Sequence, residues 1–388
     1  MKVSQNWLSE LVDINTTPEE LSEKLSIGGF EVESVEDCSS ILKGVVLGKV
    51  LSTNKHENSD KLTICKVDIG EEILQIICGA NNIRSNIYVY VATVGTKINK
   101  LDLTIRSSEI RGVLSQGMIC SLEELGLEAK STGIAIVDNS LCENFKLGSP
   151  ISDLLDLNDF IYDLAITANR PDGMSMIGIA REVSALLQTK IYFPESINNL
   201  PINEFKPQIS DTQVIDNDGI YTLTSINNID GQLISPKWLQ DRLDKSDIKS
   251  INLIVDITNY LLLEQGQPFH AFDKDKLASF IGKNVSHNDF GIRKAKQGET
   301  LQALDGNIYA LNDNITIITC LDKPIAIAGV IGGLETSVTS DTNSIFLEAA
   351  VFNPTAIRKS CKEIGLRTES SSRFEKGISN KNTIPAVK

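Results

Sequence analysis

The sequence has few of the residues that build metal sites and disulfide frameworks. Only three of its 388 residues are histidines, so a histidine-rich metal site is nearly excluded and any histidine chemistry must rest on a single residue. The seven cysteines are scattered, without a Cys-x-x-Cys pair. An odd, unclustered set of cysteines is typical of reduced thiols in the cytosol, so we expect a cytoplasmic protein.

Long hydrophobic runs are also missing. The longest one, around Ile325 to Leu334, is about half of the roughly 18 to 20 residues that a membrane-spanning helix needs. The first ten residues hold no uninterrupted apolar segment. We therefore expect neither contact with a membrane nor a secretory signal.

Positive charge is scarce as well. There are 37 Lys and Arg residues against 51 Asp and Glu residues, a net charge of −14, which excludes a general polyanion binder. The segment from Ser40 to Pro150 differs, because it holds 12 residues of each sign. A polyanion, if one binds, is expected on this neutral segment.

The pattern of the chain predicts several domains, in keeping with its length. A helix is expected after Thr17, whose side chain caps it in a capping box with Glu20. Short β-branched runs separated by turns follow from residue 40 and predict a small barrel or sandwich. An amphipathic helix is expected at 176–187, a linker at 189–217, and a mixed region beyond 218 with a helix capped at Ser235. The strand-like runs are 44–50, 62–69, 73–77, 88–94, 118–121, 315–319 and 325–330.

Two loops of the barrel segment carry residues that suit phosphate and backbone contacts. They lie in His56-Glu-Asn-Ser-Asp-Lys-Leu and in Glu109-Ile-Arg-Gly-Val-Leu-Ser-Gln-Gly. Taken alone, these residues favour a solvated turn. The candidate contacts are Asn58, Asp60, Lys61, Arg111 and Ser115.

The second half of the chain brings together a hydroxyl, an amide and a histidine. Thr258 and Asn259 lie on a short helical stretch, and His270 follows a Gly-Gln-Pro turn between Phe269 and Phe272. The flanking phenylalanines favour a core histidine when no other observation is considered.

Two further clusters surround a single acidic residue. Glu348 is the one ionised residue from Ile345 to Ile357, and on a strand a solvent-facing carboxylate is the default interpretation. An inward-pointing Glu348 is costly unless something binds it. The glycines at 329 and 332 predict a close backbone approach, and the segment with Thr368 and Ser370 predicts a polar loop and a helix cap.

In combination these motifs resemble one family. "HENSDKL", "CGANN" and "IRGVLSQGMICS" are similar to the EMAP-like oligonucleotide/oligosaccharide-binding (OB) fold attached to several aminoacyl-tRNA synthetases. "KVSQNWLSELV", "ITANRPDGMSMIGIAREV", "VDITNYLLLEQGQPFHAFD", "GVIGG" and "GLRTESSSRFEKG" resemble the bacterial phenylalanyl-tRNA synthetase β subunits. Those chains are about twice as long, so the resemblance implies an N-terminal half.

The resemblance implies an α+β multidomain fold. An EMAP-like OB-fold barrel (40–150) is inserted in a small N-terminal α+β domain (1–39 plus 151–195), and a mixed α/β editing domain (210–388) follows, cut short at its C-terminus. It further implies an (αβ)₂ heterotetramer with the α subunit, binding of tRNA(Phe), and post-transfer editing of mischarged tyrosyl-tRNA(Phe). The resemblance implies that the α subunit carries the ATP-dependent aminoacylation site. It places the Mg²⁺ sites of the family beyond residue 388. The chain has no Walker A loop, and we expect it to bind no cofactor or metal itself.

The resemblance also implies residue roles. Glu348 accepts the hydrogen bond of the tyrosine phenol, and phenylalanine would leave its charge unpaired at a cost of a few kcal/mol. His270, Thr258 and Asn259 hold the ester and a water without a covalent nucleophile. The wider editing pocket comprises Lys249, Gly329, Gly332, Thr368 and Ser370, with the glycines giving backbone access to the adenosine end or the carbonyl.

Three departures from the family pattern keep other interpretations open. Lys249 stands where the family usually has Arg, Ser370 where it has Ala, and Ser372 where it has His. One alternative is a non-catalytic tRNA-binding and assembly module with a vestigial editing pocket. Another is a free-standing deacylase that acts without an α subunit. Hydrolysis of tyrosyl-tRNA(Phe) by the purified chain separates these classes.

Overall fold

The chain folds into two compact units. The computed structural model describes residues 1–142, 145–194, 209–215 and 219–387. One unit joins Met1–Val35 to Ile161–Lys388, and the other is Glu36–Phe160. The boundaries of the smaller unit lie near those expected for the barrel, whereas the expected N-terminal and editing domains belong to one unit. The division into three domains stays a prediction.

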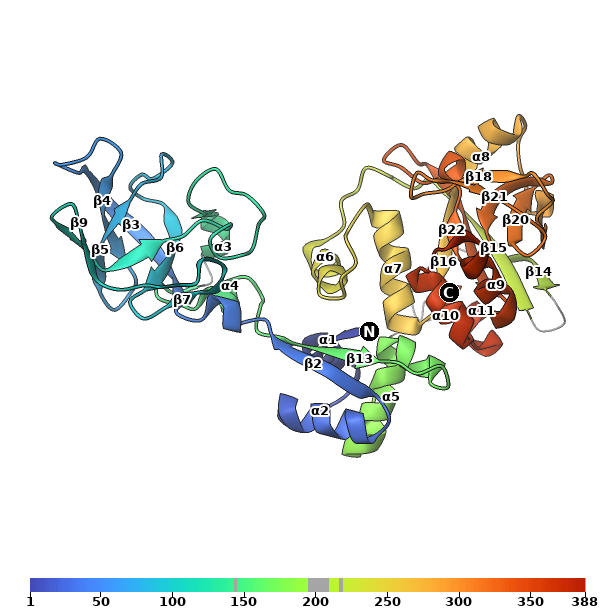
Figure 1. Cartoon of the computed structure of the whole chain (residues 1–388), viewed down its shortest axis with the longest axis horizontal. Helices are drawn as coiled ribbons and strands as arrows, with labels where there is room; N and C mark the ends of the chain where they lie inside the picture. The colour runs from blue at the N-terminus through green and yellow to red at the C-terminus, as the bar shows by residue number, and fades with distance from the viewer. Residues whose placement is uncertain (143–144, 195–208, 216–218, 388) are drawn as a thin grey trace. The chain divides into compact units, whose positions relative to one another are not determined.

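The smaller unit is built on a six-stranded antiparallel sheet in the order β11-β6-β3-β4-β5, with β12 paired to β6 (Figure 1). The strands expected from the β-branched runs are confirmed, and the first of them extends five residues further than expected, to Lys55. Alternating inward residues such as Val45 and Leu47 are buried in its core. The strands are β3 (Val45–Lys55), β4 (Thr63–Asp68), β5 (Ile73–Cys78), β6 (Tyr88–Thr93), β11 (Gly117–Ile119) and β12 (Ile136–Val137).

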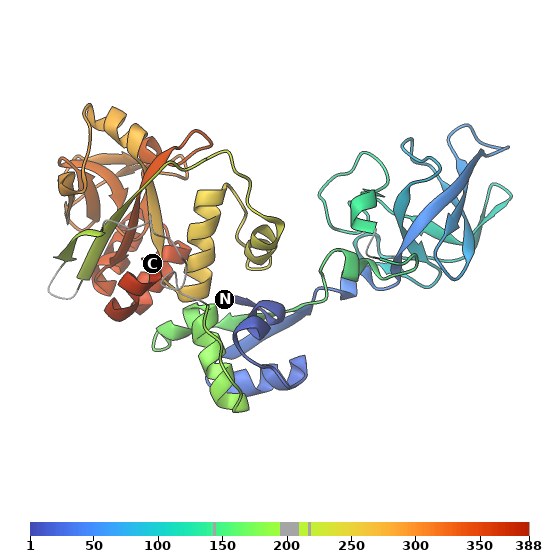
Figure 2. The same ribbon diagram turned by 180° about the vertical axis from the view of Figure 1, so that it is seen from behind.

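Shorter elements complete this unit. Two small hairpins and short helices follow the main strands, and Figure 2 shows the same strands from behind. The pairs are β7 (Lys97–Ile98) with β8 (Leu103–Thr104) and β9 (Ser108–Ile110) with β10 (Val113–Ser115). The helices are α3 (Asn139–Cys142) and α4 (Ile151–Leu154), with 3₁₀ turns at Ser40–Leu42 and Asn99–Leu101.

The N-terminal part of the larger unit is a small sheet, β1-β13-β2, with three helices. The cap of α2 is confirmed, because the Thr17 hydroxyl oxygen accepts the Glu20 N–H at 3.3 Å. The reciprocal half of the expected capping box is wrong: the Glu20 carboxylate accepts from the Thr16 hydroxyl instead. The elements are β1 (Lys2–Ser4), α1 (Gln5–Leu11), α2 (Pro18–Ile27), β2 (Glu31–Asp37), β13 (Phe160–Ala165) and α5 (Met176–Leu187).

Two four-stranded antiparallel sheets, β14-β15-β23-β16 and β17-β20-β21-β22, form the rest of the larger unit, with a β18–β19 hairpin. β14 lies within the segment expected to be a linker, so that expectation is wrong for 209–215; residues 195–208 and 216–218 lie outside the described residues. The strands are β14 (Ile209–Ile215), β15 (Gly219–Asn227), β16 (Phe269–Asp273), β17 (Phe290–Lys294), β18 (Thr300–Gln302), β19 (Ile308–Ala310), β20 (Thr316–Cys320), β21 (Lys323–Ile327), β22 (Ile331–Gly332) and β23 (Ser344–Val351).

Helices flank the first of these sheets: α7, in yellow, lies beside β16 (Figure 1), and α11 packs against β23. Ser235 does not cap α6 as expected, because its hydroxyl donates to Asp256 on α7. Buried Arg373 ties α10 to the N-terminal part by donating to the Met174 carbonyl at 3.1 Å. The helices are α6 (Lys237–Asp244), α7 (Leu253–Gln265), α8 (Lys274–Ile281), α9 (Pro354–Ile364), α10 (Glu369–Lys376) and α11 (Asn380–Val387).

Candidate functional site

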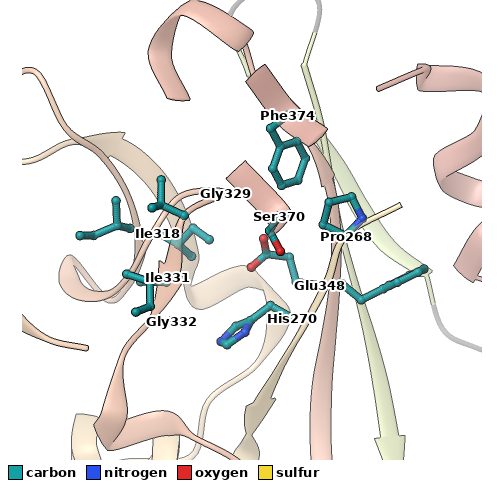
Figure 3. A pocket seen from close by; sticks show the side chains of 13 residues that line it. Pro268, His270, Ile318, Gly329, Ile331, Gly332, Glu348, Ser370 and Phe374 are labelled. Carbon is teal, nitrogen blue, oxygen red and sulfur yellow. The ribbon is translucent and has the colours of Figure 1, made fainter. Parts of the chain in front are cut away.

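Two adjacent cavities in the larger unit gather most of the predicted editing residues. The first has a volume of about 60 Å³ and is lined by His270, Gly329, Gly332, Glu348 and Ser370 (Figure 3). The second is about 470 Å³ and shares three of these residues, His270, Gly332 and Ser370. It adds three more of the predicted residues, Thr258, Asn259 and Thr368.

The pairing of β16 with β23 explains why a histidine and a glutamate meet. In this antiparallel ladder His270 lies directly opposite Glu348, so both side chains point to the same face of the sheet. Glu348 is only 5% exposed. The default interpretation of a solvent-facing carboxylate is therefore wrong, because β23 has buried residues on both of its faces.

Glu348 is held by a neighbour that the sequence did not indicate. The hydroxyl of Tyr221, on β15, donates to Glu348 Oε2 at 3.3 Å. Burial raises the pKa of Glu348 to about 8, and this hydrogen bond opposes the rise. Glu348 is thus mostly protonated at pH 7. The expectation of an ionised acceptor needs correction, because withdrawal from water outweighs the single donor.

His270 is also neutral at pH 7. Burial lowers its pKa to about 4, and its ring meets Phe272 edge-on with centroids 4.5 Å apart. Nε2 is buried and has no hydrogen-bond partner among the described residues. The interpretation as a hydrogen-bonded core histidine therefore does not fit: the ring lines both cavities and keeps unused hydrogen-bonding capacity.

Gly332 is the residue that makes room for this ring. A Cβ at position 332 would lie 2.3 Å from His270 Cε1 and 2.6 Å from Nε2, closer than real contacts allow. The close approach predicted for Gly332 is therefore to a side chain of the same chain. A ligand is not needed to explain it.

Gly329 has a similar structural reason. Its φ is +66°, a conformation that favours glycine, and a Cβ there would lie within 2.9 Å of Ile357, Phe352 and Phe374. Phe374 lines the small cavity. Both glycines thus shape the walls of the cavity, whereas the sequence suggested that they give backbone access to a ligand.

The α7 residues lie in the larger cavity. Thr258 donates its hydroxyl hydrogen to the Val255 carbonyl at 2.7 Å, so towards a ligand this hydroxyl acts as an acceptor. Asn259 lines the same cavity. The start of α7 is fixed by Asp256, which is completely buried and accepts hydrogen bonds from the Ser235 and Ser250 hydroxyls and the Ile251 N–H.

Helix α10 carries the next predicted residues. Thr368 caps this helix by accepting the Ser371 N–H, and its own hydroxyl donates to the Val330 carbonyl at 2.9 Å. Ser370 lines both cavities, whereas Ser372 lines neither. Lys249 is exposed and also lies outside the walls of both cavities. The structure therefore brings together all the predicted editing residues except Lys249.

In the barrel, the two loops with predicted tRNA contacts lie against each other. The Asn58 side chain donates to the Arg111 carbonyl at 3.3 Å, and the Arg111 guanidinium donates back to the Asn58 carbonyl at 3.1 Å. Asp60 forms an exposed ion pair with Lys55 at 2.7 Å, and Lys61 is exposed beside it. These four predicted residues share one solvent-facing part of the unit.

Ser115 does not belong to that surface. It is 2% exposed, its hydroxyl donates to the Gly117 carbonyl at 3.2 Å, and its oxygen accepts the Ile77 N–H at 3.1 Å. The prediction of a tRNA contact at Ser115 conflicts with this burial, because both capacities of the hydroxyl are used between β5 and β11. Its role here is to join strands of the barrel.

The described residues contain neither a candidate membrane-spanning helix nor a candidate metal-binding cluster. No helix among them is long and apolar enough to cross a membrane. No group of three or more His, Cys, Asp or Glu side chains within the described part of the chain is placed to hold a metal ion.

Family models match both units. Residues 219–388 match the B3/4 domain, which covers both cavities, and residues 45–143 match the putative tRNA binding domain, which covers the barrel. The fold and the site thus define a chain that combines a tRNA-binding type of barrel with a B3/4 domain.

Full-length relatives give the family. The chain is 66% identical over 388 residues to the phenylalanine–tRNA ligase beta subunit of Prochlorococcus marinus (strain MIT 9312), covering 100% of this chain and 48% of that protein. The same subunit is 64% identical in subspecies pastoris (strain CCMP1986 / NIES-2087 / MED4), with 100% and 47% covered. The chain belongs to the family of phenylalanine–tRNA ligase beta subunits and spans about half the length of these curated relatives.

Proposed function

We propose that this chain binds tRNA(Phe) and removes tyrosine wrongly esterified to it, as the editing part of a phenylalanine–tRNA ligase. The observation that carries the proposal is a carboxyl group, Glu348, buried in a small cavity beside a neutral His270. A small cavity with apolar walls and a few buried polar groups, Glu348 among them, suits a ligand that is an aromatic ring with one hydroxyl.

Selection of tyrosine follows from the cost of an unpaired polar group. A tyrosyl ring gives Glu348 a hydrogen-bond partner, whereas a phenylalanyl ring displaces water from the cavity and gives it none. An unsatisfied buried polar group costs about 1 to 3 kcal/mol. Because Glu348 is protonated at neutral pH, the preference rests on this neutral hydrogen bond, and we expect about one to two decades of selectivity.

Hydrolysis requires that the ester and a water are held next to each other in the larger cavity. The Asn259 amide offers donors to the ester carbonyl, and Thr258 offers an acceptor to the water. The neutral His270 ring retains a lone pair that accepts a proton from that water. No covalent nucleophile is assigned, because the ester is activated and positioning supplies much of the rate. The tRNA's own vicinal hydroxyl assists in this scheme.

The barrel is proposed to hold the tRNA through Asn58, Asp60, Lys61 and Arg111. The segment from Lys43 to Arg111 carries ten basic and seven acidic residues, so few phosphates are neutralised and binding is expected in the micromolar range with a shallow salt dependence. In the complete ligase the partner is the α subunit, as (αβ)₂ in the cytoplasm. The α subunit carries aminoacylation with ATP and Mg²⁺, and no step proposed here involves either.

The test is hydrolysis of tyrosyl-tRNA(Phe) and phenylalanyl-tRNA(Phe) by the purified chain. We expect the tyrosyl ester to be cleaved at least tenfold faster, and Glu348→Ala to remove most of that preference. Glu335→Ala is the matched control, because this carboxylate is exposed and lies outside both cavities. His270→Ala is expected to slow both esters with less effect on their ratio.

The outcomes also separate the alternative functions. Binding of tRNA(Phe) without hydrolysis, with and without added α subunit, would favour a non-catalytic tRNA-binding and assembly module. Hydrolysis that is unaffected by Glu348→Ala would refute the assignment of the cavity as the editing site. Phenylalanine-dependent ATP–pyrophosphate exchange by the chain alone would contradict the division of labour with the α subunit.

A further inference from the structure

Tyr221 is a buried hydroxyl for which neither the family motifs nor the proposed reaction has a use. It is 3% exposed on β15, two residues from Leu223, which pairs directly with Glu348 on β23. Tyr221 and Glu348 therefore lie diagonally on one face of the sheet. The hydrogen bond to Glu348 Oε2, at 3.3 Å, is the only one that its hydroxyl makes within the described residues.

This arrangement restricts what Glu348 offers to a ligand. A carboxyl group has two oxygens, and Tyr221 occupies one of them. Glu348 lines the small cavity, and Tyr221 is not among the residues that do. The hydrogen bond therefore anchors the carboxyl from behind and leaves the other oxygen for the cavity. Without this anchor the group would be free to rotate about its last torsion, which has broad minima.

We propose that Tyr221 is a specificity-determining residue of the pocket: it fixes the Glu348 carboxyl so that a single oxygen meets the hydroxyl of a tyrosyl ester. This inference deepens the proposed editing function and rests on it. Tyr221 acts through Glu348 and is thus a positioning residue with no contact to the substrate.

The positions of the two hydroxyl hydrogens decide whether Glu348 donates or accepts the hydrogen bond to the ligand. The Tyr221 hydrogen is directed at Oε2, so the proton of a neutral Glu348 is left for Oε1. In that state the pocket donates a hydrogen bond to the phenol oxygen of the ligand.

The electrostatic surroundings agree with a neutral carboxyl. The titratable groups that face it are Tyr221 on β15 and His270 on β16, and Tyr221 in turn interacts electrostatically with Cys320 on β20. No Lys or Arg forms an ion pair with Glu348 within the described residues. Burial raises the pKa of Tyr221 well above its usual value, so this hydroxyl keeps its hydrogen throughout the range in which Glu348 titrates.

The test compares Tyr221→Phe with the parent chain and with Tyr309→Phe. Phenylalanine retains the buried ring and removes only the hydroxyl. Tyr309 is a matched control, because its hydroxyl also donates to a carboxylate, Asp305 at 2.6 Å, on the surface of the same unit. The rates of hydrolysis of tyrosyl-tRNA(Phe) and phenylalanyl-tRNA(Phe) are measured from pH 6 to 9, and folding is followed by tryptophan fluorescence.

We expect Tyr221→Phe to lower the preference for the tyrosyl ester by about tenfold, mainly through KM, since one oriented hydrogen bond is lost. The pH at which the preference changes should also rise, because the Tyr221 hydrogen bond lowers the pKa of Glu348. Tyr309→Phe should change neither quantity. An unchanged preference and an unchanged pH profile in Tyr221→Phe would overturn the proposal.

A binding measurement separates this proposal from the proposed function. The parent and both variants are titrated with tyrosinamide and phenylalaninamide. If the parent hydrolyses no ester but prefers tyrosinamide, editing fails, and a loss of that preference in Tyr221→Phe still supports the role of Tyr221. If the parent shows no preference, or Tyr221→Phe retains it, Tyr221 does not determine specificity.

Discussion

Replacing Glu348 by glutamine should change how the stability of the larger unit depends on pH. An unfolded chain ionises Glu348 above its ordinary pKa of 4.5, whereas the folded chain keeps the proton up to about pH 8. Between these values the folded state binds more protons than the unfolded state, so stability falls as pH rises. Glutamine keeps the shape and the acceptor for Tyr221 but carries no titrating proton, and this contribution disappears.

The magnitude follows from the two buried titratable groups. His270 titrates near pH 4 when folded and near 6.5 when unfolded, so its contribution rises with pH up to 6.5 and opposes that of Glu348. From pH 6.5 to 8, Glu348 is the one of these two groups whose contribution to the stability still changes. At 1.36 kcal/mol for each pH unit, this interval corresponds to a loss of about 2 kcal/mol in the parent chain.

Tryptophan fluorescence during urea unfolding measures this loss. Both tryptophans, Trp7 and Trp238, lie in the unit that contains Glu348, and the barrel has none. Between pH 6.5 and 8 the parent should lose about 2 kcal/mol of unfolding free energy more than Glu348→Gln. Other groups that titrate, including the cysteines, cancel in this difference. Equal pH dependence in the two proteins would refute the burial of Glu348 as an acid, and Glu335→Gln should behave like the parent.

Three further predictions concern the walls of the site and the barrel. Gly332→Ala should slow tyrosyl-tRNA(Phe) hydrolysis about 100-fold in a folded chain, because the new methyl group displaces His270; an unchanged rate would remove His270 from the reaction. Ser370→Ala should raise the rate of tyrosyl-tRNA(Phe) hydrolysis several-fold by widening the small cavity. Lys249→Arg, on the surface, should leave this rate unchanged. A rate increase from Lys249→Arg alone would place that residue at the substrate. Arg111→Ala should weaken tRNA binding uniformly and reduce its salt slope by at most about one, as a filter-binding titration at several salt concentrations would reveal.

Local patterns predicted the elements better than the contacts between them. The β-branched runs predicted the strands of the barrel, and apolar spacing predicted α5, whose residues Met176, Ile179, Ala180 and Val183 are buried. Both signals are local, because the backbone period and one apolar face suffice to produce them. The cap expected for α6 at Ser235 is wrong, because the Ser235 hydroxyl donates to Asp256, 21 residues away. Sequence spacing carries no information about that partner.

The orientation of Glu348 was out of reach for the same reason. Alternation normally distinguishes the two faces of a strand, but β23 has apolar neighbours on both, because it is an inner strand with covered faces. Which way Glu348 points depends on its register with β16, nearly 80 residues earlier in the chain. The family resemblance brought His270 and Glu348 to one site, whereas it assigned no role to Tyr221 or to Asp256.

Burial holds both titratable residues of the small cavity in their uncharged forms, and this limits how the cavity discriminates. The pKa of Glu348 is raised to about 8 and the pKa of His270 is lowered to about 4, so at pH 7 neither side chain contributes a charge. Rejection of phenylalanine therefore rests on one neutral hydrogen bond left unmade, worth about 1 to 3 kcal/mol. An ionised Glu348 would discriminate more strongly, but it would also reduce the stability of the fold that positions it. Above pH 8 the same carboxyl becomes an acceptor, so selectivity for tyrosine should increase where the stability of the unit is lowest.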